Sequence, residues 1–308
     1  MIHYILRRIL ILAPTLIGIT LVSFLILQLV PGDPARTIAG LEADEDTVQA
    51  VRRELGLDKP LIVQYGLFLK NAVTGNFGQS IRTKNSVMAE IWPRFLNTLR
   101  LTFASIVISV IVGVAIGTIA AKHHNTAVDY ATMGLVLLGV STPTFWSGLI
   151  IILVFSVSLG WFPSGGAHGL IHLVLPAVTL AAPSAAITAR MTRSSMLEVL
   201  RQDYIKTARA KGQKESRVIY GHALKNALIP TVTIVGLQFG YLMGGAVLVE
   251  IIFTWPGLGR LIVNSILTRD YPIVQAGVML FATTFVLTNL IVDILYHYLD
   301  PRISYDGD

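Results

Sequence analysis

Six long stretches without charged residues recur along the chain. They cover residues 9–30, 101–121, 131–160, 170–189, 226–249 and 271–292. The hydrocarbon core of a bilayer is about 30 Å thick, and a helix needs about 20 apolar residues to cross it. Each stretch reaches that length. The pattern therefore predicts an all-α membrane protein with about six transmembrane helices.

The composition supports this prediction through its low charge. Only 14% of the 308 residues are charged, 53% are hydrophobic, and the mean hydropathy is +0.66. A soluble globular protein carries roughly 25% charged residues. The chain has no cysteine, which excludes disulfides, thiolate metal sites and cysteine nucleophiles.

The distribution of basic residues predicts the orientation in the membrane, because short cytoplasmic loops are enriched in lysine and arginine. Residues 190–225 contain nine basic and three acidic residues, a net charge of +6 that equals the net charge of the whole chain. The short loop 161–169 contains no basic residue. We therefore expect the basic loop and both termini to be cytoplasmic.

The same pattern predicts three regions. Residues 1–30 form the first transmembrane helix, 31–97 an extracytoplasmic segment, and 98–308 a five-helix core with a cytoplasmic loop at 190–228. Within the outer segment, residues 46–55 and 61–72 have the pattern of two short helices, and the first ends near Gly56. This segment is either a solvated loop or a docking platform for an extracytoplasmic partner.

The basic loop is patterned as folded structure. Ser194 to Glu198 resembles a helix start, residues 203–211 form a helix that Gly212 ends in a left-handed conformation, and residues 216–228 form a second helix ended by Pro230. The loop lacks the interleaved aromatic residues of a nucleic-acid surface. We therefore expect no nucleic-acid partner.

The motifs of several enzyme classes are absent. No Gly-Lys dipeptide occurs, and so there is no Walker-type nucleotide loop; a His-Glu-x-x-His zinc motif and a Gly-x-Ser-x-Gly elbow are also missing. The seven histidines are scattered, apart from the neighbours His123 and His124. The sequence predicts no catalytic residue, metal site or cofactor in this chain, and any ATP would be bound by separate subunits.

Residues 203–212 (DYIKTARAKG) and 222–230 (HALKNALIP) resemble the EAA loop of bacterial ABC-importer permeases, in particular the peptide and nickel branch. Segments near both ends are also similar to that branch: 4–8 (YILRR), 14–18 (PTLIG), 29–35 (LVPGDPA), 54–58 (ELGLD), 253–259 (FTWPGLG), 269–272 (RDYP) and 292–296 (VDILY). One feature departs from the family: the Glu-Ala-Ala position falls on Lys206, Thr207 and Ala208, and the glutamate is missing.

The resemblance implies the transmembrane architecture of a type I ABC importer in a bacterial inner membrane. The implied partners are membrane lipid, a homologous second permease, two ATP-binding subunits and an extracytoplasmic substrate-binding protein. It also implies that the basic loop couples to the ATPases. The expected coupling surface consists of Asp203, Tyr204, Thr207, Arg209, Ala210 and Gly212.

Within the spans, Gly236, Gly240 and Gly244 repeat at four-residue spacing, which favours close helix packing over substrate contact. Further candidates for the pathway are two polar side chains and a predicted helix break. These are Gln238 and Tyr241, and the break at Ser141, Thr142 and Pro143.

The resemblance implies a gate region at the outer face, formed by Glu250, Trp255, Pro256 and Gly257. Trp255 is alternatively an interfacial anchor. Glu250 and Asp293 lie at span ends, where an acid is costly in lipid. They leave open a proton-coupled transporter that needs no ATPase.

The sequence thus predicts the permease subunit of an ATP-driven importer for dipeptides, oligopeptides or glutathione. A nickel permease is the alternative within the same class, and the proton-coupled transporter is the alternative outside it.

Overall fold

The computed structural model describes residues 2–29, 33–40, 43–54 and 56–299. The chain divides into two compact units. Unit 1 comprises Met1–Leu96 and Leu261–Val286, and unit 2 comprises Asn97–Arg260 and Leu287–Asp308. One boundary between the two units falls between Leu96 and Asn97. The outer segment was expected to end at residue 97. Residues 261–286 group with the N-terminal part of the chain.

Unit 1 begins with α1 (Ile2–Leu29), a 28-residue helix long enough to extend about 42 Å. It contains the first predicted span except Val30, which lies outside the described residues. Three short helices follow: α2 (Pro34–Ala39), α3 (Glu45–Glu54) and α4 (Leu61–Val73). The last two confirm the helices predicted in the outer segment, although Leu55 is not among the described residues.

An aromatic contact fixes α4 against α1. The ring of Phe24 packs on Tyr65 and Phe68, with centroid separations of 5.5 and 5.9 Å. The hydroxyls of Thr20 and Tyr65 lie 2.9 Å apart. The outer segment is thus a folded structure against α1, with one isolated antiparallel bridge between Gln79 and Ser86.

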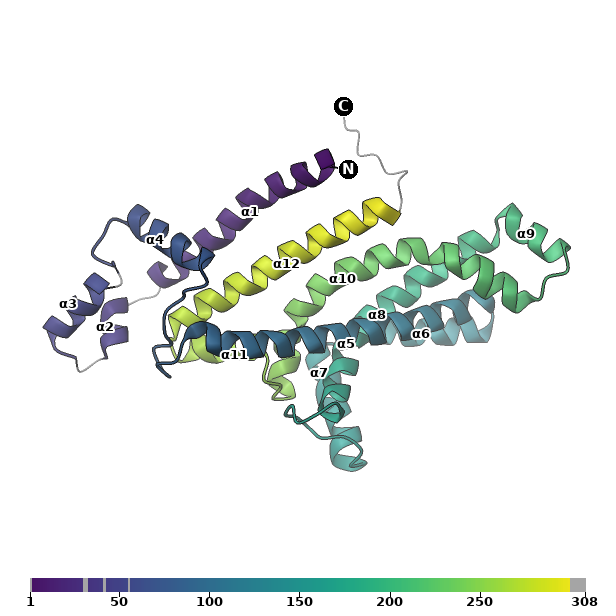
Figure 1. Cartoon of the computed structure of the whole chain (residues 1–308). Coiled ribbons are helices and arrows are strands. Elements are labelled where there is room, and N and C mark those ends of the chain that lie inside the picture. Colours follow the sequence, from purple (N-terminus) through teal and green to yellow (C-terminus); the bar gives the residue numbers. More distant parts are fainter. Residues whose placement is uncertain (1, 30–32, 41–42, 55, 300–308) are drawn as a thin grey trace. The chain divides into compact units, whose positions relative to one another are not determined.

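The remaining helices follow from Val87 onward. They are α5 (Val87–Lys122), α6 (Ala127–Ser141), α7 (Thr144–Ile151), the π-helix η1 (Ile152–Ser158), α8 (Ile171–Leu200), α9 (Asp203–Ala210), the π-helix η2 (Arg217–Ala223), α10 (Leu224–Ile252), α11 (Leu258–Leu267) and α12 (Tyr271–Leu299). Within unit 2, α5, α6, α8 and α10 run alongside one another, with α9 at one end (Figure 1).

Among the described residues, four helical segments are long and apolar enough to cross a membrane, and a fifth candidate is bent. The four are Val87–Lys122, Ile171–Leu200, Arg217–Ile252 and Tyr271–Val292. The bent candidate joins Ala127–Ser141 to Thr144–Ser158 at an angle of 107°. All five correspond to predicted runs, and the helical, strand-free fold is confirmed for the part of the chain that the structure describes.

Close approach of α5 to α8 positions the core of unit 2. A Cβ on Gly113 would lie 2.6 Å from Cβ of Thr188, and one on Gly117 would lie 2.5 Å from the carbonyl oxygen of Ala189. Such distances leave no room for a side chain, because real Cβ contacts are longer than 3.0 Å. Glycine is therefore required at both positions, as in other membrane helix contacts.

Two predictions for the basic loop are wrong. No helix starts at Ser194, because α8 runs unbroken from Ile171 to Leu200 and Met196 is completely buried beneath α9. Pro230 does not end a helix, because α10 continues through it. An interior proline costs about 3 kcal/mol in a soluble helix, but membrane bundles offset this loss through neighbouring contacts. Ala227 and Thr231 on either side are buried.

Candidate functional site

The short helix α9 presents one face to the bundle and the other to its surroundings. Ile205 and Ala208 are buried in a cluster with Met196, Val218 and Ala223. The six predicted coupling residues are all exposed: Asp203, Tyr204, Thr207, Arg209, Ala210 and Gly212. The structure therefore brings the six predicted residues together on an accessible surface, held in place by an apolar underside.

Polar contacts brace this helix. Asn226 of α10 donates a hydrogen bond from Nδ2 to the hydroxyl of Tyr204 at 2.7 Å. Across the following turn, Arg209 contacts Glu215 with Nε at 3.1 Å and Nη2 at 2.6 Å. Two of the predicted surface residues thus also stiffen the loop. Sequence reasoning missed Asn226 and Glu215, because nothing in their spacing marks a partner across a turn.

Gly212 ends α9 as predicted, with φ of +73°. Its N–H donates to the carbonyl of Arg209 at 2.9 Å. An added Cβ would meet nothing within 4 Å. The backbone conformation, and not crowding, therefore favours glycine here.

Two acids of the loop, Glu215 and Asp203, are held in their charged form. The hydrogen bond from Arg209 lowers the pKa of Glu215 below its usual value. Lys206, whose Nζ lies 2.8 Å from Oδ1 of Asp203, lowers the pKa of Asp203 in the same way. At neutral pH the exposed surface of α9 therefore carries charges of both signs.

The predicted break in the third span is confirmed. α6 ends at Ser141, α7 begins at Thr144, and Pro143 occupies the position before α7. The hydroxyl of Thr142 donates to the carbonyl of Leu138 at 2.7 Å. The N–H of Thr142 donates to the same carbonyl at 3.0 Å, so that both donors of Thr142 bond to the last turn of α6.

The other predicted pathway residues occupy different environments. Gln238 is buried, with Nε2 3.4 Å from the hydroxyl of Thr188 and no partner for Oε1 among the described residues. Tyr241 is 68% exposed.

The glycine repeat of α10 is packed at only some of its positions. A Cβ on Gly236 would lie 2.8 Å from Val292, whereas one on Gly244 would meet nothing within 4 Å. Gly240 is buried. The packing expectation thus holds at Gly236 and fails at Gly244.

An apolar groove of about 470 Å³ lies between α5 and the η2–α10 segment. None of the predicted pathway residues lines it. The lining residues are Val110, Ile111, Val114, Ala115, Thr118, Ile119, Tyr220, Leu224, Leu228, Thr231, Val232 and Val235.

The expected gate region forms a buried hydrogen-bonded cluster at the start of α11. Oε1 of Glu250 accepts from the hydroxyl of Thr98 at 2.5 Å, and Oε2 accepts from the N–H of Arg260 at 2.9 Å. The N–H of Leu258 donates to the same Thr98 hydroxyl at 2.9 Å. A carboxylate beside the first N–H groups of a helix is a favourable arrangement. Glu250 therefore has a structural task.

The other three gate residues surround this cluster. Nε1 of Trp255 donates to the carbonyl of Asn97 at 3.1 Å, and Nδ2 of Asn97 donates to the carbonyl of Pro256 at 3.1 Å. A Cβ on Gly257 would overlap the Glu250 carboxylate. Trp255 is 5% exposed, which corrects its interpretation as an interfacial anchor. Asn97 and Thr98 were not predicted, because their partners lie more than 150 positions away.

The side chain of Asp293, the second acid noted at a span end, lies outside those described. Within the described residues, no group of three or more histidine, cysteine, aspartate or glutamate side chains could hold a metal ion.

Apolar helices long enough to span a bilayer, with a braced helix exposed beyond them, define an integral membrane protein. The chain belongs to the family of binding-protein-dependent transport system inner membrane components, which matches residues 113–305. A second match, to the N-terminal part of such membrane components, covers residues 1–102. The resemblance given by the sequence motifs is therefore confirmed.

Two characterised relatives align with nearly the whole chain. The dipeptide transport system permease protein of Alkalihalophilus pseudofirmus is 46% identical, with 99% of this chain and 100% of the relative covered. The glutathione transport system permease protein of Escherichia coli (strain K12) is 48% identical over the same shares.

Among solved structures, the methionine ABC transporter MetNI in inward-facing conformations shares the fold. Its matching chain has a TM-score of 0.58 and 19% identity, with 69% of this chain and 97% of that chain covered. The fold is therefore that of an ABC importer transmembrane domain, as the sequence predicted.

Proposed function

We propose that this chain is the translocation-pathway subunit of an ATP-driven importer for dipeptides, oligopeptides or glutathione. The observation that carries the proposal is the exposed face of α9, braced from below by Ile205 and Ala208. A stiff helix joined to two long spans can transmit a push from outside the membrane into helix movement. The two relatives, which align end to end with this chain, support the substrate class.

The proposal gives ATP to separate subunits and leaves this chain without a catalytic or cofactor-binding role. Two ATPases would dock at Asp203, Tyr204, Thr207, Arg209, Ala210 and Gly212. A homologous permease would complete the pathway in the lipid of a bacterial inner membrane, with the α9 end and both termini cytoplasmic. An extracytoplasmic binding protein would deliver substrate to the opposite side, where the folded outer segment offers a surface. Substrate would cross by alternating access.

The two alternatives make different demands on the side chains of the spans. A proton-coupled carrier would need a titrating acid in the pathway, whereas the described oxygens of Glu250 both accept hydrogen bonds at the start of α11. A nickel permease would be expected to show soft or imidazole ligands lining the spans.

Transport by the reconstituted complex tests the proposal. The tagged chain is purified with its associated subunits, placed in proteoliposomes with the binding protein, and supplied with ATP on the α9 side. We expect uptake of labelled dipeptide or glutathione that stops when the ATPases carry an inactivating substitution. Uptake that continues without functional ATPases would overturn the energy source, and uptake of Ni²⁺ in place of both peptides would overturn the substrate class.

A further inference from the structure

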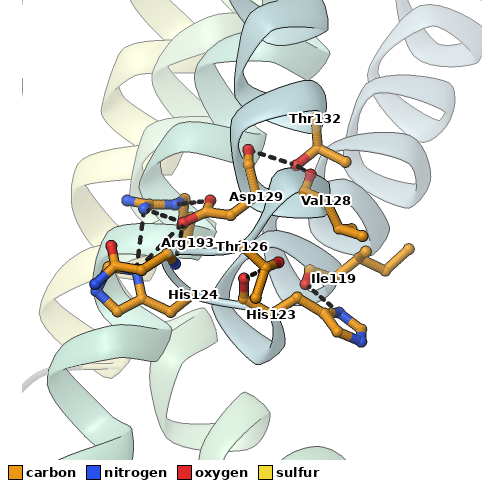
Figure 2. Close-up of polar contacts among 9 residues, drawn as sticks. Ile119, His123, His124, Thr126, Val128, Asp129, Thr132 and Arg193 are labelled. Carbon is orange, nitrogen blue, oxygen red and sulfur yellow. Dashed lines mark hydrogen bonds and ion pairs between the residues drawn. The ribbon is translucent and has the colours of Figure 1, made fainter.

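A two-pronged ion pair joins the start of α6 to α8 (Figure 2). Nε of Arg193 lies 2.7 Å from Oδ1 of Asp129, and Nη2 lies 2.6 Å from Oδ2. The Asp129 side chain is 2% exposed and that of Arg193 25% exposed. Parallel contacts between guanidinium and carboxylate fix orientation as well as distance. The two helices are therefore held in one relative rotation at this point.

The turn between α5 and α6 is part of the same arrangement. The N–H of Asn125 donates to Oδ2 of Asp129 at 3.1 Å, and Asn125 has a left-handed φ of +62°. Nδ1 of His124 lies 3.2 Å from that oxygen and 3.3 Å from Nη2 of Arg193 (Figure 2). Removal of the Arg193 charge would leave the buried Asp129 carboxylate without its main partner, which is strongly unfavourable.

Packing makes this ion pair a mechanical link. A Cβ on Gly117 of α5 would lie 2.5 Å from the carbonyl of Ala189 and 2.7 Å from Cβ of Thr192, directly before Arg193. A close approach of α5 to α8 thus lies beside the pair. The end of α5, the turn and the start of α6 are held to α8 by backbone contact and charge together.

The pair also lies close to α9. From Arg193, α8 continues for about two helical turns to Leu200. Only Arg201 and Gln202 separate it from α9, and their N–H groups bond to the carbonyls of Glu198 and Val199 at 3.2 and 3.0 Å. A displacement of α9 is therefore transmitted to α8 without a flexible connection. At its far end, α6 stops at the 107° bend.

We propose that Asp129 and Arg193 act as a positioning clamp that makes α6 move with α8 when α9 is displaced, so that the movement reaches the bend at Ser141 to Pro143. The inference rests on the proposed function, because it assumes that ATPases displace α9. Neither residue contacts substrate in this role. Loss of the clamp uncouples ATP hydrolysis from transport while the docking surface of α9 remains intact.

A reversible crosslink separates this role from a contribution to folding alone. The chain contains no cysteine, and so the double variant Asp129→Cys with Arg193→Cys places the only two thiols in this subunit. The complete complex is assembled in proteoliposomes, and substrate transported per ATP hydrolysed is measured before treatment. The measurement is repeated after a bifunctional methanethiosulfonate reagent joins the thiols, and again after reduction. The single cysteine variants receive the same reagent as controls for thiols of other subunits.

We expect the untreated double variant to transport between about 5-fold and about 150-fold less substrate per ATP, the range of ordinary coupling energies. Joining the thiols should restore the ratio, and reduction should remove the gain from the same assembled protein. The matched control is His123→Ala, which changes the neighbouring histidine of the turn, whose ring Nδ1 lies 3.0 Å from the carbonyl of Ile119. This control should keep the wild-type ratio.

Two results would overturn the clamp: a wild-type ratio in the untreated double variant, or a ratio that the crosslink leaves reduced. If the double variant fails to assemble, Arg193→Lys serves in its place, because it keeps the charge and loses the two-pronged geometry. A lower ratio at normal complex yield supports the clamp, and an unchanged ratio contradicts it. The wild-type complex is measured in parallel and tests the proposed function separately. A wild-type complex without ATP-driven uptake would refute the proposed function itself, whatever the variants show.

Discussion

The hydroxyl of Thr98 lies 2.5 Å from Oε1 of Glu250, a residue 152 positions further along the chain. This contact joins α5 to the end of α10. Because the N–H of Leu258 bonds to Thr98 and that of Arg260 to Glu250, the same pair also fixes the first turn of α11. One buried carboxylate thus organises three helices.

Glu250→Ala should destabilise the protein by about 1–3 kcal/mol, because the Thr98 hydroxyl and the Arg260 N–H would both lose the carboxylate oxygen to which they donate. Glu250→Gln is the matched control: it keeps the shape and one acceptor oxygen, and should lose less. The apparent melting temperature in detergent measures both. Equal melting temperatures for the alanine variant and the wild type would contradict this structural task.

Gly117→Ala should destabilise the contact of α5 with α8 by about 1–3 kcal/mol, since an added methyl group in a tight contact forces the backbones apart. Gly244→Ala adds the same methyl group to another span at a place where nothing lies within 4 Å. We expect it to melt at or slightly above the wild-type temperature, because alanine favours helix more than glycine does. Thermal unfolding of the purified subunit compares the two, and similar losses in both would refute the packing argument.

Hydropathy alone predicted the five candidate spans among the described residues, because a bilayer imposes length and apolarity on each helix. The first predicted span lies in α1, whose described part contributes the shorter apolar stretch Pro14–Leu25. The local signals of α9 and Gly212 were also readable, since helix periodicity and a glycine stop depend on neighbouring residues. Pairing across helices was not readable: Asp129 with Arg193 and Glu250 with Thr98 join positions far apart in sequence. The π-helical segments were missed as well, because their apolar pattern does not differ from that of an α-helix.

Local signals also failed where packing decided the outcome. Ser194 had the residue type of a helix start, yet α8 passes through it because Met196 is buried beneath α9. The glycine repeat in α10 suggested one packed face, but Gly236 is packed and Gly244 is open. Spacing predicts which residues share a face, and it does not predict what covers that face.

Gly212→Pro should uncouple ATP hydrolysis from transport without preventing membrane insertion. Proline fixes φ near −65°, whereas Gly212 has φ of +73° and uses its N–H to bond Arg209. Gly212→Asn is the matched control, because asparagine tolerates the left-handed region. Substrate transported per ATP and the amount of inserted protein are measured together. A normal ratio in the proline variant would remove Gly212 from the coupling assignment.

The Arg209–Glu215 pair should make the loop sensitive to acid. In the folded state the pKa of Glu215 lies below its ordinary value of 4.5. The contribution of the ion pair to stability is therefore fully present above pH 4.5 and is lost as the pH falls through the lower folded-state pKa. Because both side chains are partly exposed, we expect only about 0.5 kcal/mol. The difference in unfolding free energy between wild type and Glu215→Gln, measured across pH 3–7, should shrink below pH 4.5. A difference independent of pH would contradict the pair.

The central claim, that ATPase subunits dock on α9, is tested most directly by crosslinking from a single cysteine. Ala210→Cys adds one thiol at an exposed position in a chain without cysteines, and Ile62→Cys adds one at a side chain of α4 that is 86% exposed. Both variants are assembled in native membranes and treated with a short thiol-to-amine crosslinker, and the products are identified by mass spectrometry. The account predicts that Ala210→Cys is joined to an ATP-binding subunit, in a yield that changes when ATP is added, and that Ile62→Cys is not. Absence of an ATP-binding subunit from the Ala210→Cys products, in a membrane that still imports peptide, would contradict it.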